Sequence, residues 1–172
     1  MRQAVVVTAY VGLGSNLDHP PRQIALAIAA LKNEPGIRSL RVSSCYRNPP
    51  FDGSEQPDYC NAVAGLETTL KARELFAACQ RIEQAQGRIR DAVRWGPRPL
   101  DLDLLLYGDC VSQVPELILP HPGLAQRPFV LYPLLELDPD LVVPGWGPVS
   151  ELAARCDGSQ LERIPLDGSS LT

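Results

Sequence analysis

The segment Leu100–Tyr107 constrains this chain most, because it alternates leucine with aspartate before it ends in a run of leucines and a tyrosine. Alternation with a period of two predicts a β-strand with an apolar face and a polar face. The predicted apolar face consists of Leu100, Leu102, Leu104 and Leu106. Asp101 and Asp103 would then lie side by side on the other face, about 6.5 to 7 Å apart.

This pair of acids predicts a metal site. Two adjacent carboxylates repel each other unless a cation lies between them, and oxygen ligands suit Mg²⁺. Arg94 and Arg98 precede the strand and are suited to bind a polyanion such as a phosphate chain. On the acids alone, the solvated face of an edge strand is the better interpretation. Two acids, two arginines and Trp95 close together favour metal-assisted phosphate chemistry instead.

Composition narrows the class of protein. The 172 residues suit a single domain spanning 1–172, and a net charge of −4 argues against a general nucleic-acid binder. The five cysteines are widely spaced and odd in number, which indicates neither a disulfide framework nor a zinc site. The sequence shows no signal peptide and no apolar run of membrane-spanning length. We therefore expect a cytoplasmic monomer without nucleic-acid or membrane partners.

The order of predicted elements indicates the fold class. Strands are expected at 4–13, 40–47, 59–67 and 100–107, and helices at 21–32 and 72–86. Further helices are expected near 127–137 and after 148. The order strand, helix, strand, strand, helix, strand predicts an α+β fold, a ferredoxin-like βαββαβ sandwich with additional C-terminal helices. In it the first and last strands would be central neighbours, so that the Asp strand is supported on both sides.

Three other features have a functional and a structural interpretation. Tyr59 and Asn61 on one strand face suggest a slot for a flat polar heterocycle, although such residues at a strand end are more often structural. Arg88 and Arg90 either face water at a helix end or reach the same polyanion as Arg98. The sequence Gly12-Leu13-Gly14 lacks the remaining residues of a nucleotide-binding loop, so a tight turn is favoured.

Several motifs in order resemble the 6-hydroxymethyl-7,8-dihydropterin pyrophosphokinase family of folate biosynthesis. The main one is Arg-Trp-Gly-Pro-Arg-x-Leu-Asp-Leu-Asp-Leu-Leu-Leu-Tyr-Gly at 94–108. The others are Gly-Ser-Asn-Leu at 14–17, Ser-Ser-x-Tyr-Arg-x-Pro-Pro at 43–50, Gln-Pro-Asp-Tyr-x-Asn-Ala at 56–62, Gln-Arg-Ile-Glu at 80–83, Gly-Arg-x-Arg at 87–90 and Pro-His at 120–121. A match of several ordered motifs is far more specific than one short pattern.

The resemblance implies transfer of a diphosphoryl group from ATP to the pterin hydroxymethyl oxygen, with release of AMP. It assigns Asp101 and Asp103 as ligands of two Mg²⁺ ions, and Arg88 and Arg98 as catalytic arginines that close over the triphosphate. The implied nucleotide-side residues are Gln80, Glu83, Arg90, Leu104, His121 and Arg127. The implied pterin-side residues are Asn48, Pro49, Phe51, Tyr59, Asn61, Trp95 and Phe129, with Trp95 and Phe129 enclosing the ring.

The chain departs from the family pattern at four positions. Asn48 stands where threonine is often found. Glu116, Ile118 and Pro122 replace an arginine, a threonine and a tyrosine on the nucleotide side. The contacts expected there are those of the ribose and the α-phosphate.

Two other classes of protein fit part of the pattern. A two-metal nucleotidyl transferase or cyclase can also place Asp-x-Asp on such a sheet, but a third acid and, in polymerases, a basic track would be expected. A regulatory ligand-binding domain of the same fold would need no metal bridge beside an arginine cluster.

Overall fold

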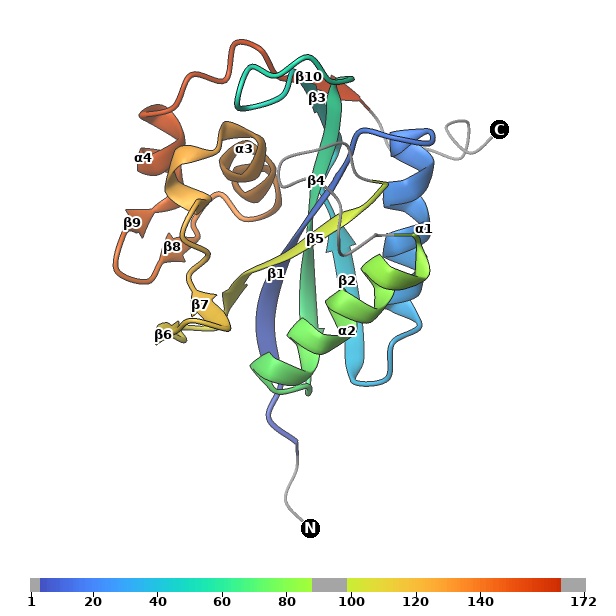
Figure 1. The fold of residues 1–172 in the computed structure, drawn as a ribbon. Helices are drawn as coiled ribbons and strands as arrows, with labels where there is room; N and C mark the ends of the chain where they lie inside the picture. Colours follow the sequence, from blue (N-terminus) through green and yellow to red (C-terminus); the bar gives the residue numbers. More distant parts are fainter. Residues whose placement is uncertain (1–3, 88–98, 165–172) are drawn as a thin grey trace.

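The computed structural model describes residues 4–87 and 99–164. In chain order the elements are β1 (Val7–Ser15), α1 (Pro20–Lys32), β2 (Ile37–Val42), β3 (Cys45–Asn48), β4 (Tyr59–Thr68), α2 (Ala72–Ala85), β5 (Asp101–Tyr107), β6 (Ser112–Val114), β7 (Leu117–Leu119), a 3₁₀ turn (Leu124–Gln126), α3 (Pro128–Leu137), β8 (Val142–Val143), β9 (Gly147–Pro148), α4 (Val149–Ala154) and β10 (Glu162–Ile164) (Figure 1). No helix in these two ranges has the length and apolar character that a membrane span requires.

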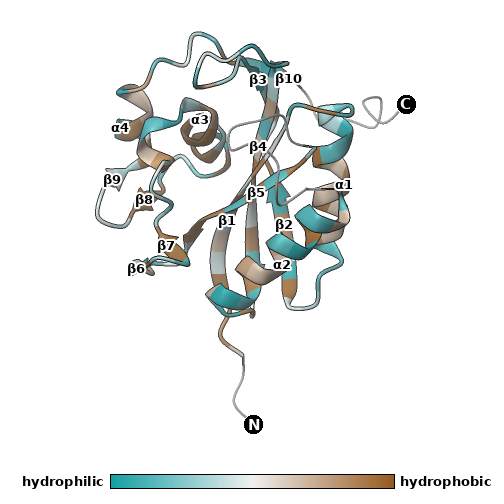
Figure 2. Ribbon diagram, in the orientation of Figure 1, coloured by the Kyte–Doolittle hydropathy of each residue, from teal (hydrophilic) through white to brown (hydrophobic). Residues whose placement is uncertain are grey.

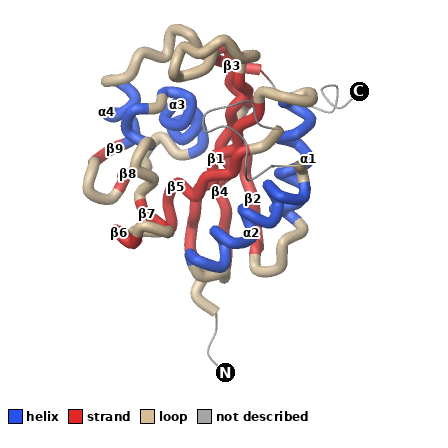
Figure 3. The backbone as a smooth tube through the Cα atoms, in the orientation of Figure 1, coloured by secondary structure: helices blue, strands red, loops and turns tan. Residues whose placement is uncertain are grey.

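The main sheet is antiparallel and has the strand order β10-β3-β4-β1-β5, with β2 also paired to β4. Figure 3 shows the strands between two groups of helices. One hydrophobic cluster joins α1 and α2 to one face of the sheet, and a second joins α3 and α4 to the other face. The chain therefore has a mixed α/β architecture with three layers.

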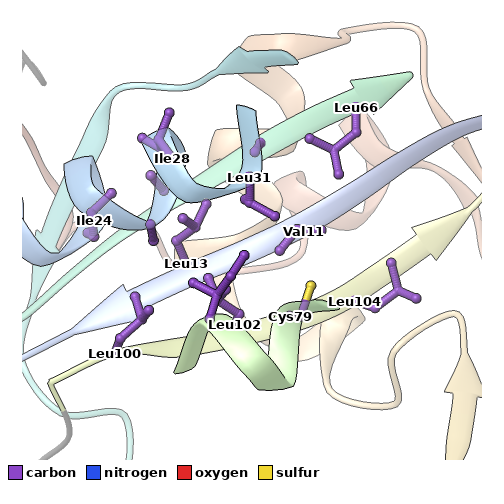
Figure 4. Close-up of a cluster of buried hydrophobic side chains, with 14 of the residues drawn as sticks. Val11, Leu13, Ile24, Ile28, Leu31, Leu66, Cys79, Leu100, Leu102 and Leu104 are labelled. Carbon is purple, nitrogen blue, oxygen red and sulfur yellow. The ribbon is translucent and has the colours of Figure 1, made fainter. Parts of the chain in front are cut away.

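The helix α1 shows how the sequence directs this packing. Two prolines occupy its first turn, where a missing backbone N–H costs nothing. Its buried residues are Ile24, Ala27, Ile28 and Leu31. This spacing makes one apolar stripe, which faces Val11 and Leu13 of β1 (Figure 4). In Figure 2 hydrophobic residues follow the strands, and hydrophilic residues mark stretches of α1 and α2.

The position of β5 differs from the prediction. Among the described strands of the main sheet, β5 pairs only with β1, so the Asp strand is an edge strand and not a central one. Two groups from outside the sheet bind its open side. The Glu83 carboxylate accepts the Leu102 N–H at 2.7 Å, and the His121 N–H donates to the Leu105 carbonyl at 2.9 Å. The outer edge of β5 is thus held by the Glu83 side chain of α2 and by the loop after β7.

A β-bulge in β5 makes a second prediction wrong, that of the face to which Leu106 points. Val11 pairs with Leu104 and Tyr10 pairs with Leu106, so Leu105 is an extra residue in β5. A bulge reverses the alternation of faces beyond it. Leu100, Leu102 and Leu104 pack with α1 and α2 as predicted, but Leu106 packs on the opposite face beside Leu105.

The predicted strand at 40–47 is two strands. β2 pairs Val42 with Ala64, whereas β3 pairs Tyr46 with Asn61, so the register shifts by one residue between them. Ser44 is the extra residue at this shift. The other predicted helices and strands are present, with ends that differ by a few residues. All five cysteines lie in the described residues, and no disulfide joins them there.

Candidate functional site

The register of β1 aligns polar residues across the sheet. Gly14 of β1 lies opposite Asn61 of β4 on one side and Asp101 of β5 on the other. Directly opposed residues share a face of an antiparallel sheet. Gly12 likewise lies between Val63 and Asp103. Asp101, Asp103 and Asn61 therefore face the same side of the sheet. Between them lies β1, which has glycines at the two positions concerned.

The two glycines keep this part of the sheet open. A Cβ atom at Gly14 would lie 2.7 Å from Asn61 Oδ1, which is too close for any ordinary contact. A Cβ atom at Gly12 would contact the Leu105 side chain at 3.5 Å. Both glycines lie inside β1, so the prediction of a tight turn was wrong. Glycine inside a strand often marks a close approach of another group, and that signal identifies them here.

A cleft of about 730 Å³ lies over this open part of the sheet. Its walls come from β1, β4, β5, α2, the loop after β3 and the segment that follows β7. It is lined by the predicted residues Asn48, Phe51, Tyr59, Asn61, Gln80, Glu83, Asp101, Asp103, His121, Arg127 and Phe129. Predicted residues separated by up to 81 positions in sequence, from Asn48 to Phe129, thus meet in one cavity.

Some predicted residues lie elsewhere. Pro49 does not line the cleft, although its neighbour Pro50 does. The Leu104 side chain is buried in the cluster with α1 and α2. Arg88, Arg90, Trp95 and Arg98 lie outside the described residues. Besides the two glycines, the cleft is lined by residues to which the sequence had assigned no role, among them Asp52, Gln56 and Phe76.

One end of the cleft is formed by amide and aromatic side chains. Asn61 Nδ2 donates to Asn48 Oδ1 at 2.7 Å, and Asn48 Nδ2 donates to the Pro49 carbonyl at 2.9 Å. This chain of hydrogen bonds fixes the Asn61 amide with its oxygen toward Gly14. Phe51 and Phe129 meet edge to face, with centroids 5.8 Å apart. Phe51 is 63% exposed, so its ring stands at the mouth of the cleft.

The other end is formed by carboxylates and cationic or polar groups. Glu83 is 4% exposed, and its bond to the Leu102 N–H fixes the strand between the two aspartates. Gln80 lines the cleft one helical turn earlier on α2. Arg127 directly precedes α3, and its guanidinium carbon lies 5.9 Å from the centroid of the Phe129 ring.

His121 is held by both its backbone and its ring. Its N–H bonds to β5, and its Nδ1 accepts the Gly123 N–H at 3.1 Å. Burial, and then the positive charge of Arg127, lower the pKa of His121 to about 4, although Asp101 acts in the opposite direction. The ring is therefore neutral at pH 7. Because Nδ1 accepts a hydrogen bond, the ring proton is on Nε2, which is a donor.

The two aspartates fit a magnesium site that is completed by phosphate. Within residues 4–87 and 99–164, no group of three or more His, Cys, Asp or Glu side chains could hold a metal ion. Mg²⁺ is usually bound by one or two carboxylates together with substrate phosphates and water. Asp101 and Asp103 provide this number of ligands on a strand whose backbone is fixed on both sides.

The His121 environment predicts a measurable pH dependence. Between about pH 6.5 and 4 the unfolded chain binds a proton at this position that the folded protein does not, so this histidine lowers stability progressively as the pH falls through that window. We expect a His121 pKa near 4 by NMR titration, assigned with a His19→Gln variant. A value at or above 6.5 would contradict the inferred neutral donor.

Comparison with known proteins identifies the family. Residues 10–139 match the family model described as 7,8-dihydro-6-hydroxymethylpterin-pyrophosphokinase (HPPK). A 2-amino-4-hydroxy-6-hydroxymethyldihydropteridine pyrophosphokinase from Pseudomonas aeruginosa is 44% identical over 161 residues, which cover 94% of this chain and 99% of that protein. The protein of that name from Haemophilus influenzae is 44% identical over 147 residues, covering 86% of this chain and 91% of the relative.

Solved structures agree on the fold. A Plasmodium falciparum HPPK-DHPS crystal structure with pteroate superposes with a TM-score of 0.67 at 11% identity, over 90% of this chain and 44% of that one. This chain thus spans less than half of that protein, and the likeness concerns the fold alone. The family model and the two relatives lead to a plain conclusion. The chain belongs to the 7,8-dihydro-6-hydroxymethylpterin-pyrophosphokinase family, whose members transfer pyrophosphate from ATP to hydroxymethyldihydropterin in folate biosynthesis.

Proposed function

We propose that the two ends of the cleft bind the two substrates, with ATP on the Asp101 side and 6-hydroxymethyl-7,8-dihydropterin on the Asn61 side. The observation that carries this proposal is the register of β1, which places both residues opposite Gly14. The pterin hydroxymethyl oxygen attacks the β-phosphorus of ATP, and AMP leaves. The product is the pterin diphosphate.

The pterin end suits a flat heterocycle with donors and acceptors on its edge. Tyr59 and Asn61 flank it on β4, and the bond from Asn61 to Asn48 directs the free amide oxygen toward a ring N–H or amino group. Phe51 and Phe129 offer aromatic surface at the mouth. Pro49 stays a predicted pterin-side residue, although its neighbour Pro50 lines the cleft. Trp95 stays the predicted second half of the ring clamp with Phe129.

The ATP end suits a polyphosphate. Asp101 and Asp103 would hold two Mg²⁺ ions, which supply neutralisation of phosphate charge when bound. His121 Nε2–H and Arg127 donate to phosphate oxygens, and Gln80 and Glu83 lie on the nucleotide side. Leu104 would serve through its backbone, because its side chain is in the core. Arg88, Arg90 and Arg98 stay predictions as residues that close over the triphosphate.

The protein's own contribution is positioning. Phosphoryl-type transfer needs in-line alignment and charge neutralisation more than covalent help from the protein. The fixed backbone of β5 orients the acids, and the Asn48–Asn61 pair orients the pterin. We propose no general base. A neutral His121 can donate a hydrogen bond at Nε2 but carries no charge of its own.

Several broader properties belong to the same proposal. The sheet order β5-β1-β4, followed by β2 and β3 as one interrupted strand, supports the ferredoxin-like βαββαβ classification. The chain forms one domain over 1–172. We also propose that it is a cytoplasmic monomer whose partners are the two small-molecule substrates, with no nucleic acid or membrane.

The acid pair provides the first test. Asp101→Asn and Asp103→Asn should each lower pterin-dependent AMP formation by at least about 10² to 10³-fold, because charge stabilisation of the reacting phosphates is lost. The circular dichroism spectrum should stay that of the wild type, because both side chains line the cleft and neither belongs to a hydrophobic cluster. Asp109→Asn, in the exposed turn after β5, is the matched control and should retain wild-type activity. Activity near wild type in both site variants would refute the metal assignment.

Gly14 provides the second test. In Gly14→Ala the new methyl group would displace the Asn61 amide, because its position is 2.7 Å from Oδ1. We expect pterin affinity to fall by about tenfold, the change that 1.4 kcal/mol produces. Calorimetric titration with pterin and, separately, with Mg-ATP measures both ligands. A variant that is folded and binds pterin as the wild type does would show that Asn61 does not need this geometry.

A further inference from the structure

A polar cluster lies on the side of Asn61 that faces away from the two aspartates. It consists of Glu136 near the end of α3, Ser44 and Tyr46 around the start of β3, and Arg163 of β10. The Glu136 carboxylate accepts the Tyr46 hydroxyl at 2.6 Å, the Ser44 N–H at 3.0 Å and the Ser44 hydroxyl at 2.9 Å. Arg163 Nη2 donates to the same carboxylate at 2.6 Å, and its Nε donates to Ser44 Oγ at 2.7 Å.

The cluster continues the cross-strand row of the candidate site. Arg163 lies opposite Tyr46, and Tyr46 lies opposite Asn61. The row therefore runs from Arg163 through Tyr46, Asn61 and Gly14 to Asp101. Asn48 is two residues beyond Tyr46 on β3, so it faces the same side. The strand that carries the cluster thus also carries the residue that orients the Asn61 amide.

Glu136 binds the residue that sets the register of β3. Ser44 is the extra residue between the β2 and β3 pairings, and a bulged residue loses its place in the ladder. Its N–H donates to the carboxylate instead. A slip of one residue would move every β3 side chain to the opposite face. Asn48 would then point away from the cleft.

The carboxylate is charged when it makes these bonds. Burial alone would raise the pKa of Glu136, but the hydrogen bonds from Tyr46 and Ser44 and the charge of Arg163 hold the pKa below its usual value. Charge-assisted hydrogen bonds are stronger than neutral ones. This is a firmer attachment than the other pair joining these strands, Arg47 and Glu162, whose exposed side chains are 3.6 Å apart.

β10 lies outside the family match, which ends at residue 139. Figure 1 shows it beside β3 at one end of the sheet. Without β10, β3 would be the edge strand next to β4. Arg163 is the residue of β10 that contacts both Ser44 and Glu136.

We propose that Glu136 and Arg163 are positioning residues that clamp the β3 bulge at Ser44 and so hold the Asn48–Asn61 amide pair in the geometry that binds pterin. The inference rests on the proposed function, which assigns that pair to the pterin. It adds that a segment beyond the matched family region determines affinity for one substrate. Neither residue lines the cleft, so both act through Asn48 and Asn61.

The test measures the affinity of the full chain for each of the two substrates separately. Glu136→Gln and Arg163→Ala are titrated with pterin in the presence of Mg²⁺ and α,β-methylene-ATP, and with that nucleotide alone. We expect pterin to bind about tenfold more weakly, the effect of losing a charge-assisted contact, while the nucleotide affinity changes less than about twofold. Glu162→Gln removes an exposed ion pair between the same two strands and should leave both affinities unchanged.

Two further variants test the same contacts by smaller changes. Tyr46→Phe removes one hydrogen bond to Glu136 without changing the packing, so it should weaken pterin binding even if Glu136→Gln fails to fold. Arg163→Lys retains the charge and should recover part of the loss in Arg163→Ala. Unchanged pterin affinity in the folded variants, or equal loss for both ligands, would overturn the clamp. Failure of the wild type to bind pterin would instead overturn the proposed function, and the clamp with it.

Discussion

The pairing of β1 with both β4 and β5 is the constraint on which the rest of the site depends. Because Gly14 lies opposite both Asn61 and Asp101, an amide and a carboxylate face the same side across one strand. The glycines of β1 leave the space between this amide and this carboxylate free of side chains. A larger residue at Gly14 would meet Asn61, so the backbone itself forms the floor of the cleft.

The bulge at Leu105 separates two regions on this face of the sheet, a hydrophobic core under α3 and the candidate functional site. Beyond the bulge, Leu105 and Leu106 pack beneath α3 with Tyr10 and Val63. Before it, Asp101 and Asp103 stay uncovered by that helix and line the cleft. Arg127 directly precedes the same helix and Phe129 lies in its first turn, so one element closes the core and contributes to the cleft wall.

Much of the fold was predictable because its signals are local. The period of two at 100–104 and the helix at 21–32 depend only on nearby residues, and both predictions are confirmed. The acids and the pterin-side residues of β4 were likewise visible as motifs, and the structure brings them together in one cleft.

The rest depends on contacts that no local pattern contains. Alternation indicates which residues share a face but not which strand lies alongside. The last strand was expected beside the first in the centre of the sheet, whereas the order β4-β1-β5 places it beside β1 at the edge. The face of Leu106 depends on a bulge that only the pairing with β1 reveals. The interaction of Glu136 with Ser44 joins residues 92 positions apart and carries no sequence motif.

In the proposed arrangement the cleft presents the β-phosphorus of ATP to the pterin hydroxymethyl oxygen. The most direct measurement supplies ATP labelled with ³²P at the β position, together with Mg²⁺ and 6-hydroxymethyl-7,8-dihydropterin, and follows the label by chromatography. We expect the label in the pterin diphosphate, and we expect the AMP formed to be unlabelled. Label retained in ADP, or released as free pyrophosphate, would contradict it.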